Sequence, residues 1–257
     1  MVVAELRFTI IKDTSYAMAE HAIRHYLEAL IFNGQILGRE FPTFLQQDCF
    51  ISRVVLAEPS AMAHEHHSAS SKEALMALGK AGLAFPKLSI LGEDLMSNHT
   101  DPCATPQALF LYCRFGLMNS VLYCAEHFAP VPLYRFKPTS GSDHQDLIRW
   151  QLQYQALDEI QMQEQRVLPK IAENSLQQLH SSLNKQGRKF ATKIAKQQGV
   201  PVYYALYSGS SHHCDAEIDK CCPSCGQAWR LQKPLHQLFD FQCHRCLLVS
   251  NIAWQCQ

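Results

Sequence analysis

The sequence predicts an α+β protein with an N-terminal α/β sandwich, two amphipathic helices and a C-terminal zinc ribbon. Strand and helix patterns alternate over residues 1–100, two helical patterns with apolar stripes follow, and two C-x2-C pairs stand near the end of the chain. We therefore expect a sandwich at 1–100, a strand hairpin carrying two helices at 101–211, and the ribbon at 212–257. A chain of 257 residues with 47% hydrophobic content can bury a sizeable core.

The N-terminal part begins with an alternating pattern over residues 2–11, in which Leu6, Phe8 and Ile10 share one face of a strand. A helix over 15–32 follows, capped by Asp13 or Thr14 and ended by Asn33-Gly34. The other expected elements are strands at 35–37, 49–57 and 86–91 and a helix at 72–83 with Ser70 or Ser71 as its cap. This order of strands and helices favours a ferredoxin-like sandwich.

Three histidines, His64, His66 and His67, stand in a small, polar stretch at 60–71. Imidazoles this close together can bind a metal ion. A solvated loop explains them better, because no second ligand cluster lies at a fixed distance along the chain.

The middle part begins after prolines at 102 and 106, with a strand expected at 109–113. Cys124 and His127 have the spacing of a zinc-binding turn, and Cys103 and Cys113 are the nearby thiols that would complete such a site. No partner pair stands at the distance typical of a ribbon, so a second zinc ion is the lesser alternative.

Two helices are expected at 143–165 and 170–198, and the second has the sharper amphipathic pattern. Its apolar face consists of Leu176, Leu179, Leu183, Phe190 and Ile194, and its basic face consists of Lys185, Arg188, Lys189, Lys193 and Lys196. Residues 166–198 hold seven basic residues and one acidic residue, whereas the whole chain has no net charge. The basic face is either a contact for phosphates or a solvated helix surface.

The ribbon is predicted from Cys222-Pro-Ser-Cys225 and Cys243-His-Arg-Cys246. Two residues between thiols form a tight turn, and two facing turns complete a tetrahedron around Zn²⁺ at about 2.3 Å from each sulfur. Four protein ligands leave no position for water or substrate, so the zinc is expected to be structural. Cys221 would spoil the spacing, and Cys256 lies beyond the second turn as a spare thiol. Strands are expected around Trp229, at 239–241 and after the second pair, with a chain turn at Lys233-Pro234.

The location and class of the protein follow from what the sequence contains and lacks. It shows no signal peptide and no run of about 18 apolar residues, so we expect no membrane span. Eleven cysteines without an export signal indicate the cytoplasm, where thiols stay free or hold metal. No nucleophile elbow, phosphate loop or dinucleotide fingerprint is present, which disfavours an enzyme but leaves open a site assembled around Glu126 or the three histidines.

Several blocks resemble a bacterial family of uncharacterised zinc-ribbon-containing proteins to which nucleic-acid binding has been ascribed. They are Cys222-Pro-Ser-Cys-Gly226, Trp229, Phe239-Asp-Phe241, Cys243, Cys246, Ser250-Asn-Ile-Ala-Trp254, Gly199-Val-Pro-Val-Tyr-Tyr204 and Pro130-Val-Pro-Leu-Tyr134. The resemblance implies zinc ligation by the four ribbon cysteines and no established activity. The family pattern has a cysteine pair before the Pro-x-Pro-Leu-Tyr block, where this chain has His127 as the second member.

Two functions are expected from these patterns. The first is a nucleic-acid-binding protein that uses the basic helix face. The ribbon contributes no net charge to such binding, because residues 215–257 carry four basic and four acidic residues. The second is an adaptor that presents the ribbon and the N-terminal sandwich to a protein partner. The sequence does not indicate the oligomeric state.

Overall fold

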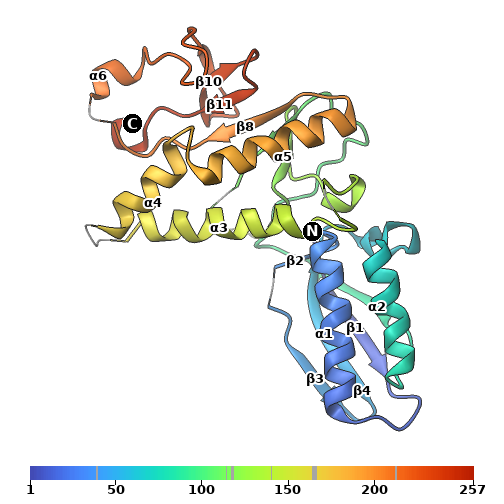
Figure 1. Cartoon of the computed structure of the whole chain (residues 1–257). Helices are drawn as coiled ribbons and strands as arrows, with labels where there is room; N and C mark the ends of the chain where they lie inside the picture. The colour runs from blue at the N-terminus through green and yellow to red at the C-terminus, as the bar shows by residue number, and fades with distance from the viewer. Residues whose placement is uncertain (39, 114, 117–118, 140, 164–166, 212) are drawn as a thin grey trace. The chain divides into compact units, whose positions relative to one another are not determined.

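A computed structural model describes the chain except for residues 39, 114, 117–118, 140, 164–166 and 212 (Figure 1). The structure is a mixed α+β protein that divides into two compact units. Unit 1 consists of residues 1–102, 117–120 and 129–146, and unit 2 consists of residues 103–116, 121–128 and 147–257. The segment 212–257 therefore lies in the same unit as most of 101–211. No described helix is long and apolar enough to cross a membrane.

Unit 1 contains a five-stranded antiparallel sheet and two helices, α1 and α2. The strands lie in the order β2-β4-β1-β5, and β3 pairs separately with β4. Their bounds are β1 (Val2–Thr9), α1 (Tyr16–Phe32), β2 (Ile36–Leu37), β3 (Thr43–Gln46), β4 (Cys49–Leu56), α2 (Ala69–Lys80) and β5 (Lys87–Glu93). The strands and helices predicted from residues 2–91 are thus present, and β3 is the strand that the pattern did not indicate.

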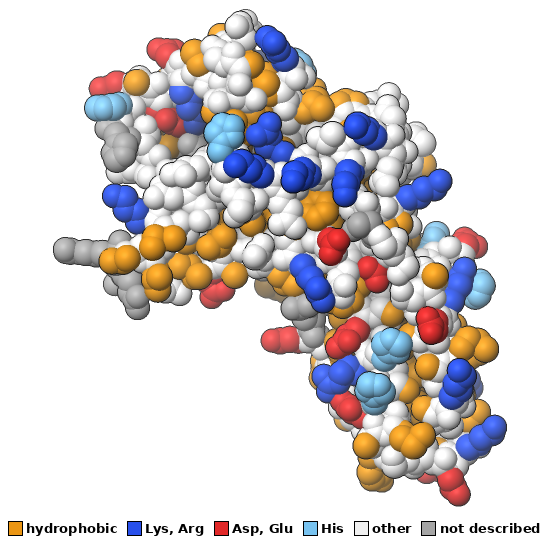
Figure 2. Space-filling view, in the orientation of Figure 1, with side chains coloured by type: hydrophobic (Ala, Val, Ile, Leu, Met, Phe, Trp, Pro, Cys, Tyr) orange, Lys and Arg blue, Asp and Glu red, His pale blue; other side chains and the backbone are white. Residues whose placement is uncertain are grey.

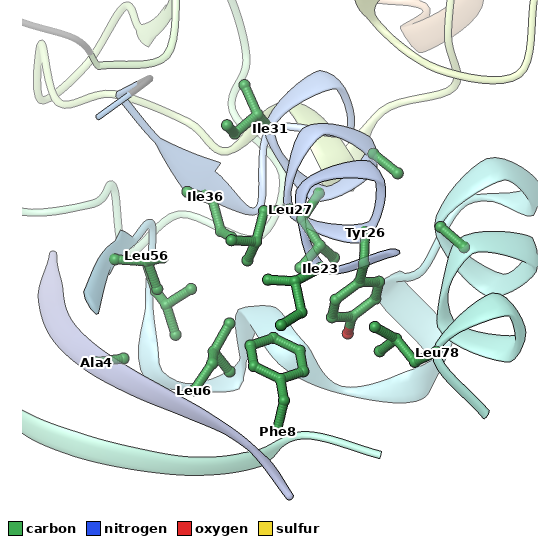
Figure 3. Packing of buried hydrophobic residues seen from close by; sticks show 14 of the residues in the cluster. Ala4, Leu6, Phe8, Ile23, Tyr26, Leu27, Ile31, Ile36, Leu56 and Leu78 are labelled. Carbon is green, nitrogen blue, oxygen red and sulfur yellow. The ribbon is translucent and has the colours of Figure 1, made fainter. Parts of the chain in front are cut away.

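The core of unit 1 lies between the sheet and α1. Alternation along β1 buries Leu6 and Phe8 and leaves Arg7 exposed, as the strand pattern predicts. Ile23 and Leu27 of α1 point toward these strand residues (Figure 3). Burial of apolar surface therefore packs alternate residues of the strand against helix residues that are spaced four positions apart.

The predicted helix caps of unit 1 are wrong by a few residues. Ser15, not Asp13 or Thr14, caps α1, and its Oγ accepts from the Met18 N–H at 3.2 Å. Ser68 caps α2, and its Oγ accepts from the Ser71 N–H at 3.1 Å. Several residues able to cap a helix stand close together at each start, at 13–15 and at 68–71, so the sequence alone does not indicate which side chain reaches the N3 amide.

Unit 2 is built on a six-stranded sheet in the order β7-β6-β8-β11-β10-β9. The bounds are β6 (Leu109–Leu111), β7 (Leu122–Cys124), β8 (Val202–Leu206), β9 (Arg230–Leu235), β10 (Phe239–Cys243) and β11 (Leu248–Ser250). Strand β8 pairs in parallel with both β6 and β11, and the other pairs are antiparallel. The three C-terminal strands therefore continue the sheet that β6 and β8 begin.

The expected helix at 170–198 is two helices, α4 (Leu168–Gln177) and α5 (Ser182–Gln198), which follow α3 (Gln145–Gln161). The buried Asn184 side chain explains the break, because its Nδ2 donates to the carbonyls of Leu176 at 2.7 Å and Gln178 at 2.8 Å. These bonds satisfy the end of α4, and the Ser181 Oγ caps α5 by accepting from the Asn184 N–H at 3.1 Å. Arg166, counted with the basic residues of this region, lies outside the described residues.

Two features of the C-terminal strands differ from expectation. The chain turns at His236 and Gln237, both with positive φ (53° and 58°), and β9 continues through Lys233-Pro234. Cys214, in α6 (Cys214–Glu217), forms a disulfide with Cys256, in η4 (Trp254–Cys256), so the expectation that Cys256 is a spare thiol is wrong. The pairing follows from tertiary contact: Trp254 and Gln255 donate to the carbonyls of Ser208 and Gly209, which brings the chain end beside α6.

Candidate metal centre

The first thiol turn of unit 2 is closed by its own backbone. The Gly226 N–H donates to the Cys222 carbonyl at 2.8 Å, and the Cys222 N–H donates to the Gln227 carbonyl at 2.9 Å. Gly226 has φ of 72°, in the left-handed region, which a glycine adopts without steric cost. The turn aims the sulfurs of Cys222 and Cys225 to the same side.

The second thiol turn connects β10 to β11 and faces the first. Cys243 is the last residue of β10, and Leu247, which follows Cys246, has φ of 50°. The sulfurs of Cys222, Cys225, Cys243 and Cys246 all lie within 4.8 Å of one another, and Cys225 Sγ is 3.7 Å from Cys243 Sγ. Four thiols at these separations can hold one metal ion. The exposed Cys221 is not part of the group.

The surroundings of the four thiols favour loss of a proton from one of them. The backbone N–H of Gln227 lowers the pKa of Cys225 to about 7, because it donates to the thiolate. Burial raises the pKa of Cys222 to about 12 and raises that of Cys243. Cys225 therefore ionises before Cys222 and Cys243, and a metal ion would favour the thiolate form of these two.

A cluster of polar and aromatic side chains packs next to the first thiol turn. Trp229 is buried, stacks on Phe241 with ring centroids 5.2 Å apart, and donates from Nε1 to the Lys220 carbonyl at 2.9 Å. The Lys220 ammonium lies 4.7 Å from the centre of the Phe241 ring and pairs with the buried Glu217. Trp229 is therefore a core residue. The other tryptophan of this segment, Trp254, is 48% exposed.

The predicted basic residues lie on α5, and Lys and Arg side chains gather over this helix in Figure 2. The lysines among them are exposed, and Arg188 is half-buried. A groove of about 490 Å³ is lined by Lys185, Arg188, Lys189, Ala191, Thr192, Lys193, Val202, Tyr204, Cys246 and Leu247. The groove therefore joins the basic helix to the second thiol turn, and Lys196 is not among its lining residues. Sequence reasoning missed the contribution of residues 246–247, which are more than fifty positions beyond the lysines.

The three clustered histidines of unit 1 do not form a metal site with one another. His67 is buried, not solvated as expected, and both its ring nitrogens are engaged: Nδ1 donates to the Ala63 carbonyl at 3.1 Å, and Nε2 accepts from the Tyr26 hydroxyl at 3.1 Å. Burial lowers the pKa of His67 and keeps the ring neutral. His66 packs on the Tyr134 ring at 4.7 Å.

The cluster around Cys124 and His127, which the sequence leaves as the lesser alternative, is brought together in part. Donor atoms of Cys103, Cys124 and His127, all in unit 2, lie within 4.8 Å of one another. The second thiol considered from the sequence, Cys113, is buried elsewhere and is not in the group. The tertiary structure thus distinguishes between two thiols that the sequence leaves equivalent.

Fold and site define a mixed α+β protein with a four-cysteine group able to hold a metal ion. Three models of domains of unknown function match the chain: DUF8589 over residues 1–92, DUF2310 over 103–207 and DUF8594 over 211–256. An uncharacterized protein of Haemophilus influenzae is 36% identical over 231 residues, which cover 87% of each chain. A second uncharacterized protein of that species is 36% identical over 179 residues, covering 68% of this chain and 86% of its own. The chain belongs to this bacterial family of uncharacterised proteins.

A solved structure adds no argument about activity. A candidate antibiotic biosynthesis monooxygenase from Deinococcus radiodurans is 13% identical, and the match covers 39% of this chain and all of that one with a TM-score of 0.27. A likeness at this level supports no conclusion about the fold or the chemistry of this chain.

Proposed function

We propose that this chain is a cytoplasmic zinc-ribbon protein that binds nucleic acid, with a structural Zn²⁺ held by Cys222, Cys225, Cys243 and Cys246. The observation that supports it most is the groove in which basic side chains of α5 meet the second thiol turn. A metal ion in the four-cysteine group would then hold one wall of the phosphate-binding surface in place. For unit 1 we retain the ferredoxin-like assignment, which its order of strands and helices supports.

Zinc is the proposed metal because of the donor set. Four thiolates in a tetrahedron are the usual ligands of structural zinc, and they leave no open coordination position. Strand β9 lies at the edge of the sheet and has no buried side chain, so a metal ion that ties the two thiol turns together would add to the stability of this part of the sheet. Zinc ligation also requires that these four thiols stay reduced, as thiols do in the cytoplasm, whereas the Cys214–Cys256 disulfide lies outside the group.

Phosphates are the proposed ligand of the groove because of its charge. Lys185, Arg188, Lys189 and Lys193 contribute to the lining, and no carboxylate is among the described residues that line it. The lysines are free to move toward a backbone phosphate because they are exposed. Neutralising phosphates with such side chains releases counterions from the nucleic acid, which gives binding its characteristic dependence on salt.

The test is the affinity for fluorescein-labelled single-stranded and duplex oligonucleotides, measured by anisotropy between about 50 and 200 mM salt. Four phosphate contacts predict a loss of about 100-fold in duplex affinity over this range. Reversing Lys185, Lys189 and Lys193 to Glu should reduce the slope of log affinity against log salt by roughly 3. The control reverses three exposed lysines of unit 1, Lys12, Lys72 and Lys80, so that the net charge changes equally. Equal effects of the two triple variants, or affinity that salt does not change, would rule out this groove.

A protein partner is the second candidate, favoured by the edge of the unit 1 sheet. Strand β5 is an edge strand, and its apolar residues Leu88, Ile90 and Leu91 are exposed. An edge strand with exposed apolar side chains can receive a strand or an apolar surface from another chain. Capture of one stoichiometric protein after nuclease treatment, lost on changing Ile90 to Lys, would support this alternative.

A further inference from the structure

We propose that Cys103, Cys124 and His127 form a second metal site in unit 2, separate from the four-cysteine group. Cys124 Sγ lies 3.7 Å from His127 Nδ1, and the Cys103 sulfur lies within 4.8 Å of both donors. Ligand atoms of one tetrahedral zinc ion are spaced at similar distances, since each ligand lies about 2.0–2.3 Å from the metal. The donors come from two segments, one that precedes β6 and one that begins at the last residue of β7.

The backbone around Cys124 and His127 has the shape of the two thiol turns described above. Phe128, the residue after His127, has φ of 53°, and its N–H donates to the Cys124 carbonyl at 2.9 Å. Gly226 has the same relation to Cys222, with φ of 72° and a bond of 2.8 Å. In each turn the residue after the second donor is in the left-handed region, which turns the two donor side chains to one side.

The left-handed conformation of Phe128 is informative because phenylalanine rarely adopts it. A bulky residue with positive φ costs roughly 1–2 kcal/mol and persists only where its surroundings enforce it. Here the ring of Phe128 stacks on His236 with centroids 4.9 Å apart and packs against Tyr123 at 5.2 Å. His236 in turn donates from Nε2 to the Ala125 carbonyl at 2.8 Å, inside the same turn. The turn is therefore held in a donor-presenting shape by an aromatic cluster.

Cys103 is positioned by a contact between its segment and the turn. The Glu126 carboxylate accepts from the Gln107 N–H at 3.3 Å, and its other oxygen lies 3.7 Å from Cys103 Sγ. The Ala125 N–H also donates to the Ala108 carbonyl at 3.0 Å, which continues the pairing of β6 with β7. These bonds hold residues 103–108 against the turn.

The donor set defines the class of metal. Two thiolates and one imidazole suit Zn²⁺ and related borderline ions, and they disfavour Mg²⁺ and Ca²⁺, which prefer oxygen ligands. The three donors leave one tetrahedral position for an oxygen ligand, unlike the closed four-cysteine group. Cys124 is buried, Cys103 is half-buried and His127 is exposed, so a metal ion can enter from the surface.

The test is the metal content of the whole chain, purified under reducing conditions and loaded with Zn²⁺ or with Co²⁺. Mass spectrometry of the metals should find about two ions per chain, as expected for two independent sites. His127→Ala, which changes an exposed side chain, and Cys103→Ser should each lower the content to about one. In the cobalt-loaded protein, these two substitutions should remove the visible absorption bands of a site with sulfur and nitrogen ligands. The absorption bands of the all-thiolate site should remain.

The controls separate this site from the four-cysteine group. Cys222→Ser with Cys225→Ser should remove the all-thiolate bands and leave the mixed sulfur and nitrogen bands. Cys49→Ser and Cys113→Ser change thiols outside both groups and should keep both ions. One ion per wild-type chain that Cys222→Ser with Cys225→Ser removes, or two ions that His127→Ala and Cys103→Ser do not reduce, would overturn the second site. Circular dichroism of His127→Ala confirms that the loss is one of a ligand and not of the fold.

Discussion

At the scale of single residues, each of the three donor turns needs a residue with positive φ after its second donor. Only in the turn that ends at Gly226 does the residue type reveal this conformation. Gly226 after Cys225 is a residue that adopts positive φ freely, so the first turn can be predicted from its residue types. Leu247 and Phe128 take the same region in the other two turns, and neither residue type indicates it. Packing enforces the conformation in those turns, and packing is decided by residues far away in the chain.

Gly226→Ala should weaken metal binding through the backbone alone. A Cβ at Gly226 would meet no atom within 4 Å, so the cost is the left-handed conformation, about 1–2 kcal/mol. If the turn forms fully only with metal, this cost appears as a roughly 5- to 30-fold lower zinc affinity in a chelator competition. Gly199→Ala is the matched control, because Gly199 has φ of 70° and equally open space but ends α5 and belongs to neither thiol turn. An equal loss of zinc affinity in both variants would contradict the account.

His144 should make unit 1 less stable in acid. Burial lowers its pKa to about 4, so the folded protein keeps the ring neutral while the unfolded chain takes up a proton below pH 6.5. Stability is therefore undiminished above that pH and falls as the pH drops toward 4, by about 3 kcal/mol between pH 7 and pH 4. Urea unfolding of wild type and His144→Gln at both pH values measures this difference. A variant that loses as much stability as wild type on acidification would show that other groups are responsible.

At the scale of elements, α5 illustrates what periodicity predicts and where it fails. The apolar positions Leu183, Phe190 and Ile194 are buried, as the helical pattern predicts. The break between α4 and α5 was missed because asparagine and serine are tolerated inside helices, and their side chains cap a helix only when the chain actually bends there. Asn184 is buried and also accepts from the Tyr204 hydroxyl at 2.6 Å, so the break is tied to the sheet.

Gly187→Ala should loosen the packing of α5 on its neighbours. A Cβ at Gly187 would lie 2.4 Å from the Tyr204 ring and 2.6 Å from the Trp150 ring, too close for either. We expect a loss of about 1–3 kcal/mol in the free energy of unfolding, although alanine is the better helix former. Gly79→Ala, at an exposed position of α2 with open space, should instead stabilise the protein by about 0.5–1 kcal/mol. Urea titrations give both values, and a stabilised Gly187→Ala protein would refute the close packing.

At the scale of the whole molecule, the sheet of unit 2 brings distant segments together. Val202 pairs with Leu109, and Tyr204 pairs with Leu248, both in parallel. Parallel neighbours are joined by long connections, so no turn motif reveals which strands pair. The groove between α5 and the second thiol turn exists because β11 lies beside β8. The disulfide between Cys214 and Cys256 likewise joins residues 42 positions apart.

The sequence by itself determined the four-cysteine group, the amphipathic faces and most strands, because spacing within a turn and periodicity within an element are local properties. It placed the lysines of α5 on one exposed face, but it did not show that Cys246 and Leu247 share their groove. It presented Cys103 and Cys113 as equal partners for Cys124 and His127, and only the pairing of β6 with β7 selected Cys103. Which residues meet across the chain depends on strand order and packing, and these are set by the burial of the whole core.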